Sequence, residues 1–150
     1  MARQTSTASL RTLEGIAVRA ARDTDVKSVV ELLLSEHHLE VAFDPAQFVV
    51  AESQGNILAC ARLKPLDDVT WEIASVVVRQ GARRGGVGAA VAKAALARAT
   101  GTVYALALAP EFFASLGFRK LEAVPAILHG TATSVCASSG FVPMMRPPPG

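Results

Sequence analysis

The sequence has 150 residues, enough for one ordinary domain; 51% of them are hydrophobic and only 19% are charged. A chain this apolar can bury enough surface to offset its ordering entropy, which excludes disorder as the main state. Fifteen basic and 13 acidic residues give a net charge of +2, too weak an excess to indicate a nucleic-acid-binding protein. The apolar runs are too short, or too interrupted by charge, to cross a membrane as a helix.

Composition also suggests how the chain is divided. We expect a flexible polar lead at residues 1–14, a single domain at 15–146 and a proline-rich tail at 147–150. The lead lacks the apolar segment of a secretory signal. Cys60 and Cys136 lie far apart in the sequence and in no metal-ligand spacing. We therefore expect reduced thiols in a cytoplasmic protein that binds no metal.

Hydrophobic periodicity predicts strands that alternate with helices along the chain. In the first half we expect a strand at 16–20, a helix from 26 to about 37, a loop or irregular helix at 39–47, a hairpin of strands 48–52 and 57–63, a connection at 65–68 and a strand at 69–78. In the second half we expect a loop at 79–86, a helix at 87–99, a buried strand at 102–108, a short helix at 111–116 and strands at 118–121 and 141–145. This order predicts an α/β protein with a mixed sheet and helices on its faces.

The clearest chemical signal is the loop at residues 83–88, Arg-Arg-Gly-Gly-Val-Gly, between the strongest strand and the longest helix of the second half. Gly86 and Gly88 remove side chains at the turn, so several backbone N–H groups can point to one spot at the positive end of the helix dipole. Such a spot suits a phosphate or pyrophosphate. Three arginines add positive charge beside it: Arg79, Arg83 and Arg84.

Two other phosphate-binding loops fit this segment poorly. A Walker A loop requires G-x-x-x-x-G-K-[ST]; Gly81–Gly86 has the glycine spacing, but Val87 and Gly88 replace the Lys and the Ser/Thr. A dinucleotide-binding fingerprint requires G-x-G-x-x-G and a later acidic residue, whereas this chain has Val91 at the third glycine and no acid at 106–108. A further alternative is a glycine-rich turn whose arginines are merely solvated.

The loop resembles the acyl-coenzyme A pyrophosphate loop of the GNAT N-acetyltransferases, Gln/Arg-x-x-Gly-x-Gly/Ala, which residues 83–88 match in full. Phe112–Phe118, with the sequence FFASLGF, resembles the helix-to-strand segment F-[YF]-x-x-x-G-F of the same family. With the order of elements, the resemblance extends over roughly Ile16–Phe118. Trp71–Val78 and Glu111–Phe113 are most similar to the small N-acetylglutamate-synthase-like and arsenic-resistance-associated acetyltransferases.

The resemblance implies a single-domain GNAT fold: a mixed, mostly antiparallel sheet with helices on both faces and a splayed central strand pair. It implies acetyl-CoA as co-substrate, with its pantetheine between the strands 69–78 and 102–108. The backbones of Val76 and Val78 would bond the pantetheine. The pyrophosphate would lie on the loop and the start of the following helix, at Arg83, Arg84, Gly85, Gly86, Val87, Gly88 and Ala89.

The resemblance also implies transfer of the acetyl group to the amine of a small molecule, an amino acid or an analogue, by direct attack on the thioester. The amine must lose a proton; Glu72 is the candidate base, directly or through water, and the alternative is that Glu72 only orients the substrate. A backbone N–H of Val76 or Val77 could face the developing oxyanion. Many relatives have a proton-donating Tyr at the position of Phe113, so no general acid is assigned, and Tyr104 is expected to be a core aromatic.

Departures from the family pattern keep an alternative open. Ala107 and Leu108 stand where the resembling branch often has hydroxyl residues. Together with Phe113 they favour, as the alternative, a non-catalytic acyl-CoA-binding module or sensor. A nucleotide-binding domain of another class is a third, more remote, alternative. As partners we expect a small-molecule amine, no nucleic acid and no membrane, and two copies could form a homodimer through the apolar C-terminal strand.

Other polar residues are expected to be structural. His37 and His38 are placed at a helix end, where partial positive charge is favoured. Arg62 and Lys64 could meet a substrate carboxylate, but a solvated strand face is the simpler interpretation. Cys136 has no neighbour in the sequence that would lower its pKa, so it is expected to be unreactive.

Overall fold

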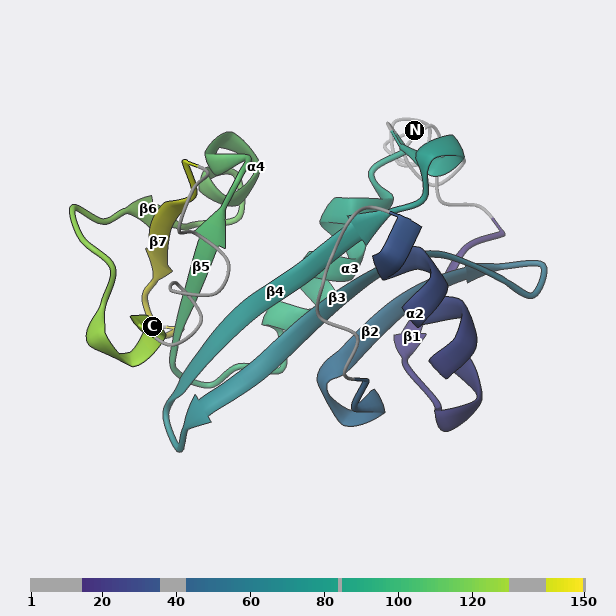
Figure 1. Cartoon of the computed structure of the whole chain (residues 1–150), viewed down its shortest axis with the longest axis horizontal. Helices are drawn as coiled ribbons and strands as arrows, with labels where there is room; N and C mark the ends of the chain where they lie inside the picture. The colour runs from purple at the N-terminus through teal and green to yellow at the C-terminus, as the bar shows by residue number, and fades with distance from the viewer. Residues whose placement is uncertain (1–14, 36–42, 84, 130–139, 150) are drawn as a thin grey trace, which may run out of the picture. The chain divides into compact units, whose positions relative to one another are not determined.

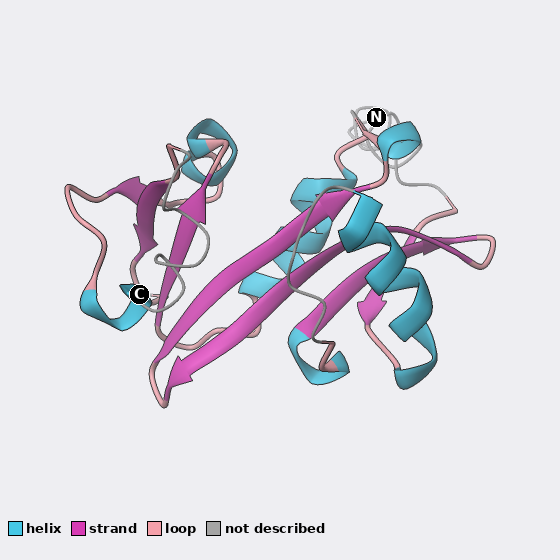
Figure 2. Ribbon diagram, viewed as in Figure 1, coloured by secondary structure: helices cyan, strands magenta, loops and turns pink. Residues whose placement is uncertain are grey.

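The structure of the chain is a computed structural model that describes residues 15–35, 43–83, 85–129 and 140–149. Its strands are β1 (Ala17–Ala20), β2 (Phe48–Ser53), β3 (Asn56–Asp67), β4 (Thr70–Val78), β5 (Thr102–Ala107), β6 (Arg119–Lys120) and β7 (Val142–Arg146) (Figure 1). Its α-helices are α2 (Val26–Ser35), α3 (Val87–Leu96) and α4 (Pro110–Ala114), and its short 3-10 helices are η1 (Asp23–Asp25), η2 (Pro45–Gln47), η3 (Gln80–Ala82) and η4 (Ala126–Leu128) (Figure 2). The predicted helix end at His37 and His38, and Cys136, lie outside the described residues.

Within the described ranges the strands form a seven-stranded sheet in the order β1-β2-β3-β4-β5-β7-β6. β4 and β5 run parallel, whereas β1–β2, β2–β3, β5–β7 and β6–β7 are antiparallel pairs. The β4–β5 ladder is short and extends from the pair Thr70–Thr102 to the pair Glu72–Tyr104. The predicted mixed, mostly antiparallel α/β fold is confirmed. None of the helices in the described part of the chain is long and apolar enough to cross a membrane.

The chain divides into two compact units, and each unit is built from two segments. Unit 1 comprises Met1–Arg62 and Ser75–Ala95, and unit 2 comprises Leu63–Ala74 and Leu96–Gly150. The strands β3 and β4 therefore pass from one unit to the other along their length. The loop that the sequence singles out, at 83–88, belongs entirely to unit 1.

The core of unit 1 forms where α2 packs on the sheet. Apolar residues at helical spacing place one face of α2 against alternate residues of the strands. The buried cluster consists of Val29, Leu32 and Leu33 from α2 with Phe48, Val50, Ile57, Cys60 and Val77 from β2, β3 and β4. The intervening residues Val49 and Ala51 are buried as well, so β2 is covered on both faces. Figure 1 shows α2 and α3 on opposite sides of these strands.

In unit 2, alternate residues of β5 are buried, whereas Thr102, Tyr104 and Leu106 are partly exposed. The predicted buried strand is therefore buried on one face and only partly covered on the other. Leu108, just beyond the strand, is 69% exposed.

Gly101 precedes β5 at a close approach of two backbone segments. A Cβ atom added at Gly101 would collide with the carbonyl oxygen of Val69, so a glycine is required there.

Two predicted boundaries are wrong. Residues 65–68 were expected to be a connection, but β3 continues to Asp67 and the turn is confined to the next two residues, where the Asp67 carboxylate accepts a hydrogen bond from the N–H of Val69 at 2.9 Å. Pro65 is tolerated in this strand because the β2–β3 ladder ends at Arg62, beyond which one edge of β3 has no β2 partner. The helix expected to reach Ala99 ends at Leu96.

Candidate functional site

The loop between β4 and α3 in unit 1 is fixed to the sheet at its first residue. The Arg79 N–H donates to the carbonyl of Leu58 at 2.7 Å. The guanidinium of Arg79 donates to the carbonyl of Ile57 from Nε at 3.1 Å and from Nη2 at 2.9 Å. Arg79 therefore ties the start of the loop to β3, a positioning contact that the sequence did not suggest.

The helix α3 begins where the backbone turns at Gly86. Gly86 has φ +76°, a conformation that residues with a side chain rarely adopt, and its carbonyl accepts from the N–H of Ala90 at 3.0 Å. An α-helix leaves its first N–H groups without intrahelical partners, here those of Val87, Gly88 and Ala89. Val87 is 2% exposed and so anchors the helix start in the core. The loop therefore places these N–H groups at the positive end of the helix dipole, and their role in binding a pyrophosphate stays a prediction.

A shallow pocket of about 360 Å³ lies at this loop, entirely within unit 1. It is lined by Ile16, Leu58, Arg79, Gly81, Ala82, Arg83, Gly85 and Val87. Arg83 Nε donates to the carbonyl of Val78 at 3.3 Å, so its side chain folds back over the end of β4. The structure thus brings Arg79, Arg83 and Gly85 to one pocket, while Arg84 lies outside the described residues.

The last part of β4 carries the two predicted pantetheine contacts. Val76 and Val78 are partly exposed, whereas Val77 is 4% exposed and belongs to the core of unit 1. Ser75, just before them, has φ +52°, in the left-handed region. The roles of Val76 and Val78 stay predictions.

The candidate base lies earlier on β4, in unit 2. Glu72 is 3% exposed, in register with Tyr104 of β5. A buried carboxylate is costly unless it is hydrogen-bonded or paired, which is why such residues concentrate at functional sites. Tyr104 is partly exposed rather than a core aromatic. The catalytic role of Glu72 stays a prediction.

The position at which many relatives have a Tyr is part of an aromatic cluster in unit 2. The ring centroid of Phe113 lies 5.1 Å from that of Phe112 and 5.4 Å from that of Phe118, both in edge-to-face geometry. Phe113 thus contributes packing and has no hydroxyl to donate.

Arg62 is not on a solvated strand face, so that interpretation is wrong. It is 8% exposed; its Nε donates to Gln47 Oε1 at 2.7 Å, and its guanidinium lies 5.9 Å from the centre of the Phe48 ring. These contacts join β3 to η2, so they place Arg62 in the packing of unit 1.

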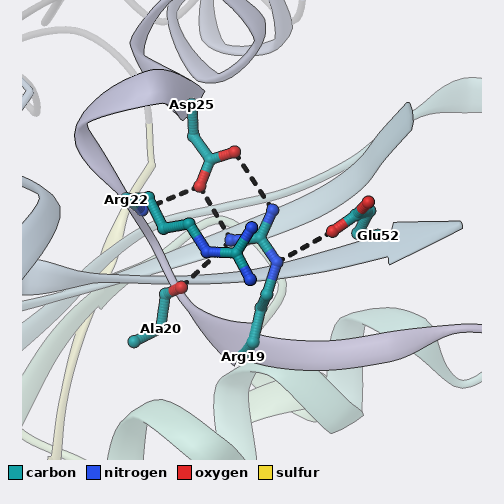
Figure 3. Close-up of polar contacts among 5 residues, drawn as sticks. All are labelled: Arg19, Ala20, Arg22, Asp25 and Glu52. Carbon is teal, nitrogen blue, oxygen red and sulfur yellow. Dashed lines mark hydrogen bonds and ion pairs between the residues drawn. The ribbon is translucent and has the colours of Figure 1, made fainter. Parts of the chain in front are cut away.

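An ion-pair network that the sequence pattern does not indicate lies in unit 1 (Figure 3). Arg19 donates to both carboxylate oxygens of Asp25, at 2.8 and 3.1 Å, and its Nε donates to Glu52 at 2.8 Å. The backbone N–H of Arg22 donates to Asp25 at 2.7 Å. The Arg19 hydrogen bonds hold the pKa of Asp25 below its ordinary value, although burial opposes this effect. The network joins β1, η1 and β2. Its Arg19–Glu52 pair links residues 33 positions apart, which spacing alone does not reveal.

In the residues that the structure describes, no three His, Cys, Asp or Glu side chains converge in a group that could hold a metal ion.

Comparisons with known proteins identify the family. A sequence model described as "Acetyltransferase (GNAT) domain" matches residues 44–120, just over half of the chain and including the whole loop. The chain belongs to the GNAT acetyltransferase family. The predicted resemblance is thereby confirmed.

Three solved structures illustrate the likeness to this GNAT protein. Rv2747 from Mycobacterium tuberculosis, crystallised with CoA and NLQ, is 25% identical with a TM-score of 0.73, and the match covers 87% of this chain and 98% of that one. N-acetylglutamate synthase from Neisseria gonorrhoeae, with CoA and N-acetyl-glutamate, is 22% identical with a TM-score of 0.75; the match covers 90% of this chain but 35% of the synthase. Ard1 from Thermoplasma volcanium is 19% identical with a TM-score of 0.72, over 91% of this chain and 99% of that one.

Proposed function

We propose that this GNAT protein is an acetyl-CoA-dependent N-acetyltransferase that acetylates the amine of a small molecule, an amino acid or an analogue. The observation that carries the proposal is the loop of unit 1, where the backbone turns at Gly86 and α3 begins at the next residue, Val87. Family membership supports acyl transfer as the chemistry. The ligands of Rv2747 and of the synthase, CoA with NLQ or N-acetyl-glutamate, support a small acceptor of the amino-acid class.

The loop fits an anionic coenzyme for two reasons. The N–H groups of Gly85 to Ala89 offer neutral donors at the positive end of a ten-residue helix, where a pyrophosphate is stabilised by several hydrogen bonds at once. The space in which a Cβ of Gly86 would project is open, since no atom of the described residues other than the two chain neighbours lies within 4 Å of it, so a phosphate can approach the backbone. Arg83 and Arg84 would add charge, while Val76 and Val78 would hold the pantetheine through their backbones.

Before the acceptor amine can be acetylated it must lose a proton, and a side chain must accept that proton. An ammonium has no lone pair, so the amine must lose a proton before it attacks the thioester carbonyl. Glu72, whose side chain is buried on β4, would accept this proton directly or through a water. The thiolate of CoA would leave without a dedicated acid, because the family's Tyr position is held by Phe113 within the aromatic cluster. Positioning of the two substrates would supply much of the rate.

The coenzyme site can be tested with a pair of matched glycine variants. Gly86 and Gly55 both have positive φ, +76° and +82°, and a Cβ at either would meet open space. Gly86→Ala and Gly55→Ala should therefore strain the backbone and lower the free energy of unfolding by similar amounts, about 1 kcal/mol. Only Gly86→Ala should weaken CoA binding in calorimetry, because Gly55 lies in the β2–β3 turn. Equal CoA affinity in the two variants would show that the loop is not part of the coenzyme site.

The reaction can be tested by incubating the protein with acetyl-CoA and a panel of amino acids and related amines while thiol release is followed. We expect turnover with at least one amine. Glu72→Gln should lower kcat by about 100-fold or more and steepen its dependence on pH, whereas the exposed Glu122→Gln should leave kcat unchanged. Unchanged kcat in Glu72→Gln would refute the role of this residue. CoA binding without turnover on any amine would refute acetyltransferase activity. It would favour the alternative, a non-catalytic acyl-CoA-binding module, which Phe113 and the exposed Leu108 motivate.

A further inference from the structure

The backbone of β4 departs from regular strand geometry at one residue within unit 1. Ser75 has φ +52°, a left-handed conformation that L residues with a side chain rarely adopt. Such a residue persists only where its surroundings over-determine it, and strained positions of this kind cluster at ligand-binding sites. Ser75 immediately precedes Val76, one of the two proposed pantetheine contacts.

The side chain in contact with it is that of Cys60, on the neighbouring strand β3. The Cys60 thiol donates to the carbonyl of Ser75, with the sulfur 3.4 Å from the oxygen. The thiol therefore holds the peptide group that joins Ser75 to Val76. Cys60 is fully buried, and with Val77 it belongs to the core of unit 1, so its position is fixed by packing.

We propose that Cys60 is a positioning residue whose thiol holds the carbonyl of Ser75 and so keeps the peptide group between Ser75 and Val76 oriented for the acyl-coenzyme. This inference rests on the proposed function of the loop and of Val76. It needs a side chain that donates a hydrogen bond, which valine and alanine cannot do. Burial raises the pKa of the Cys60 thiol to about 12, so the thiol remains protonated and keeps its donor at neutral pH.

The test compares three substitutions of Cys60 with a control in the same core. Cys60→Val removes the donor at similar volume, Cys60→Ala removes it and leaves a cavity, and Cys60→Ser restores it. Val50 is the register partner of Cys60 on β2 and is also fully buried. Val50→Ala therefore opens a cavity in the same cluster without removing the hydrogen bond from Cys60 to Ser75. Each variant is measured for unfolding in urea, for amide hydrogen exchange at Val77 and for CoA affinity by calorimetry.

In Cys60→Val and Cys60→Ala we expect exchange at Val77 to accelerate and CoA affinity to fall, each by about 5- to 30-fold, the factor that corresponds to the loss of one such restraint. Cys60→Ser should recover most of both, and Val50→Ala should change neither beyond its effect on unfolding. Val77 exchange and CoA affinity in Cys60→Val equal to the wild-type values would overturn the inference. So would losses in Val50→Ala as large as those in Cys60→Ala, because these would reflect core packing alone.

The two proposals can fail separately. If the wild-type protein does not bind CoA, the proposed function fails, while Val77 exchange still reports whether Cys60 holds the backbone. If CoA binds and amide exchange at Val77 is insensitive to Cys60→Val, the positioning role of Cys60 is refuted and the proposed function stands.

Discussion

Replacement of Asp25 tests whether the Arg19 network holds the first strand and helix of unit 1 together. The Asp25 side chain receives two hydrogen bonds from Arg19 and one from the N–H of Arg22, and the residue is 8% exposed. Asp25→Ala removes all three acceptor contacts. Asp25→Asn removes the negative charge but keeps one oxygen that can accept from Arg22.

The magnitude follows from what remains around Arg19. Breaking a fully buried ion pair by removing one partner costs about 3–5 kcal/mol. Here the Arg19 side chain is 18% exposed and keeps its bonds to Glu52, at 2.8 Å, and to the Ala20 carbonyl, at 3.1 Å. Its positive charge therefore stays compensated in the variant. We therefore expect Asp25→Ala to lower the free energy of unfolding by about 2–3 kcal/mol and Asp25→Asn by about 1–2 kcal/mol.

Urea unfolding at neutral pH, followed by circular dichroism, measures both values. Asp23→Asn is the matched control, because Asp23 lies on the same 3-10 helix but is exposed, and it should change the free energy of unfolding by less than about 0.5 kcal/mol. Asp25→Ala within that same range of the wild type would refute the reasoning. So would an Asp23→Asn effect as large as that of Asp25→Asn, since the loss would then be a general effect of charge.

Three further predictions concern separate features. Arg19 lowers the pKa of Asp25 in the folded state. The stabilisation by this carboxylate is therefore complete above its unfolded-state pKa of about 3.9 and is lost as the pH falls through the lower folded-state pKa. In urea titrations, the difference in the free energy of unfolding between wild type and Asp25→Asn should shrink between pH ~5 and ~2. The Cys60 thiol, with a pKa raised to about 12 by burial, should be labelled by iodoacetamide only when the protein unfolds, as peptide mass spectrometry would show; rapid labelling of the native protein would contradict its burial. Gly101→Ala should destabilise the protein by at least about 2 kcal/mol in urea, because its Cβ would collide with the Val69 carbonyl, whereas Gly140→Ala, whose Cβ would meet open space at φ +59°, should cost only about 1 kcal/mol.

Much of the fold follows from local patterns in the sequence. Strands β2 and β4 are marked by β-branched runs, the hairpin turn by Gln54-Gly55, and the start of α3 by the glycines before Val87. These features are decided by neighbours in the chain, so periodicity and turn chemistry suffice. The boundary of β3 was wrong for a non-local reason: Pro65 ends a strand only where its missing N–H would break a ladder, and the end of the β2 pairing at Arg62 depends on tertiary structure.

The candidate site likewise has parts that are local in the sequence and parts that depend on tertiary structure. The loop was predictable because backbone N–H groups, glycines and a helix start form one contiguous segment. The hydrogen bonds from Cys60 to Ser75, from Arg79 to Ile57 and from Arg62 to Gln47 join residues that lie 15 or 22 positions apart in the sequence. None of them has a signal in one sequence, because hydrogen-bonding partners across a sheet are set by strand register, which spacing alone does not reveal.

The most direct test of the central claim is a calorimetric titration of the full chain with CoA, ATP and NAD in turn. We expect saturable binding of CoA at one site per chain, weakened in Gly86→Ala and unchanged in Gly55→Ala, with NAD and ATP binding more weakly. Tight binding of ATP or NAD, with none of CoA, would contradict the assignment of this loop to an acyl-coenzyme.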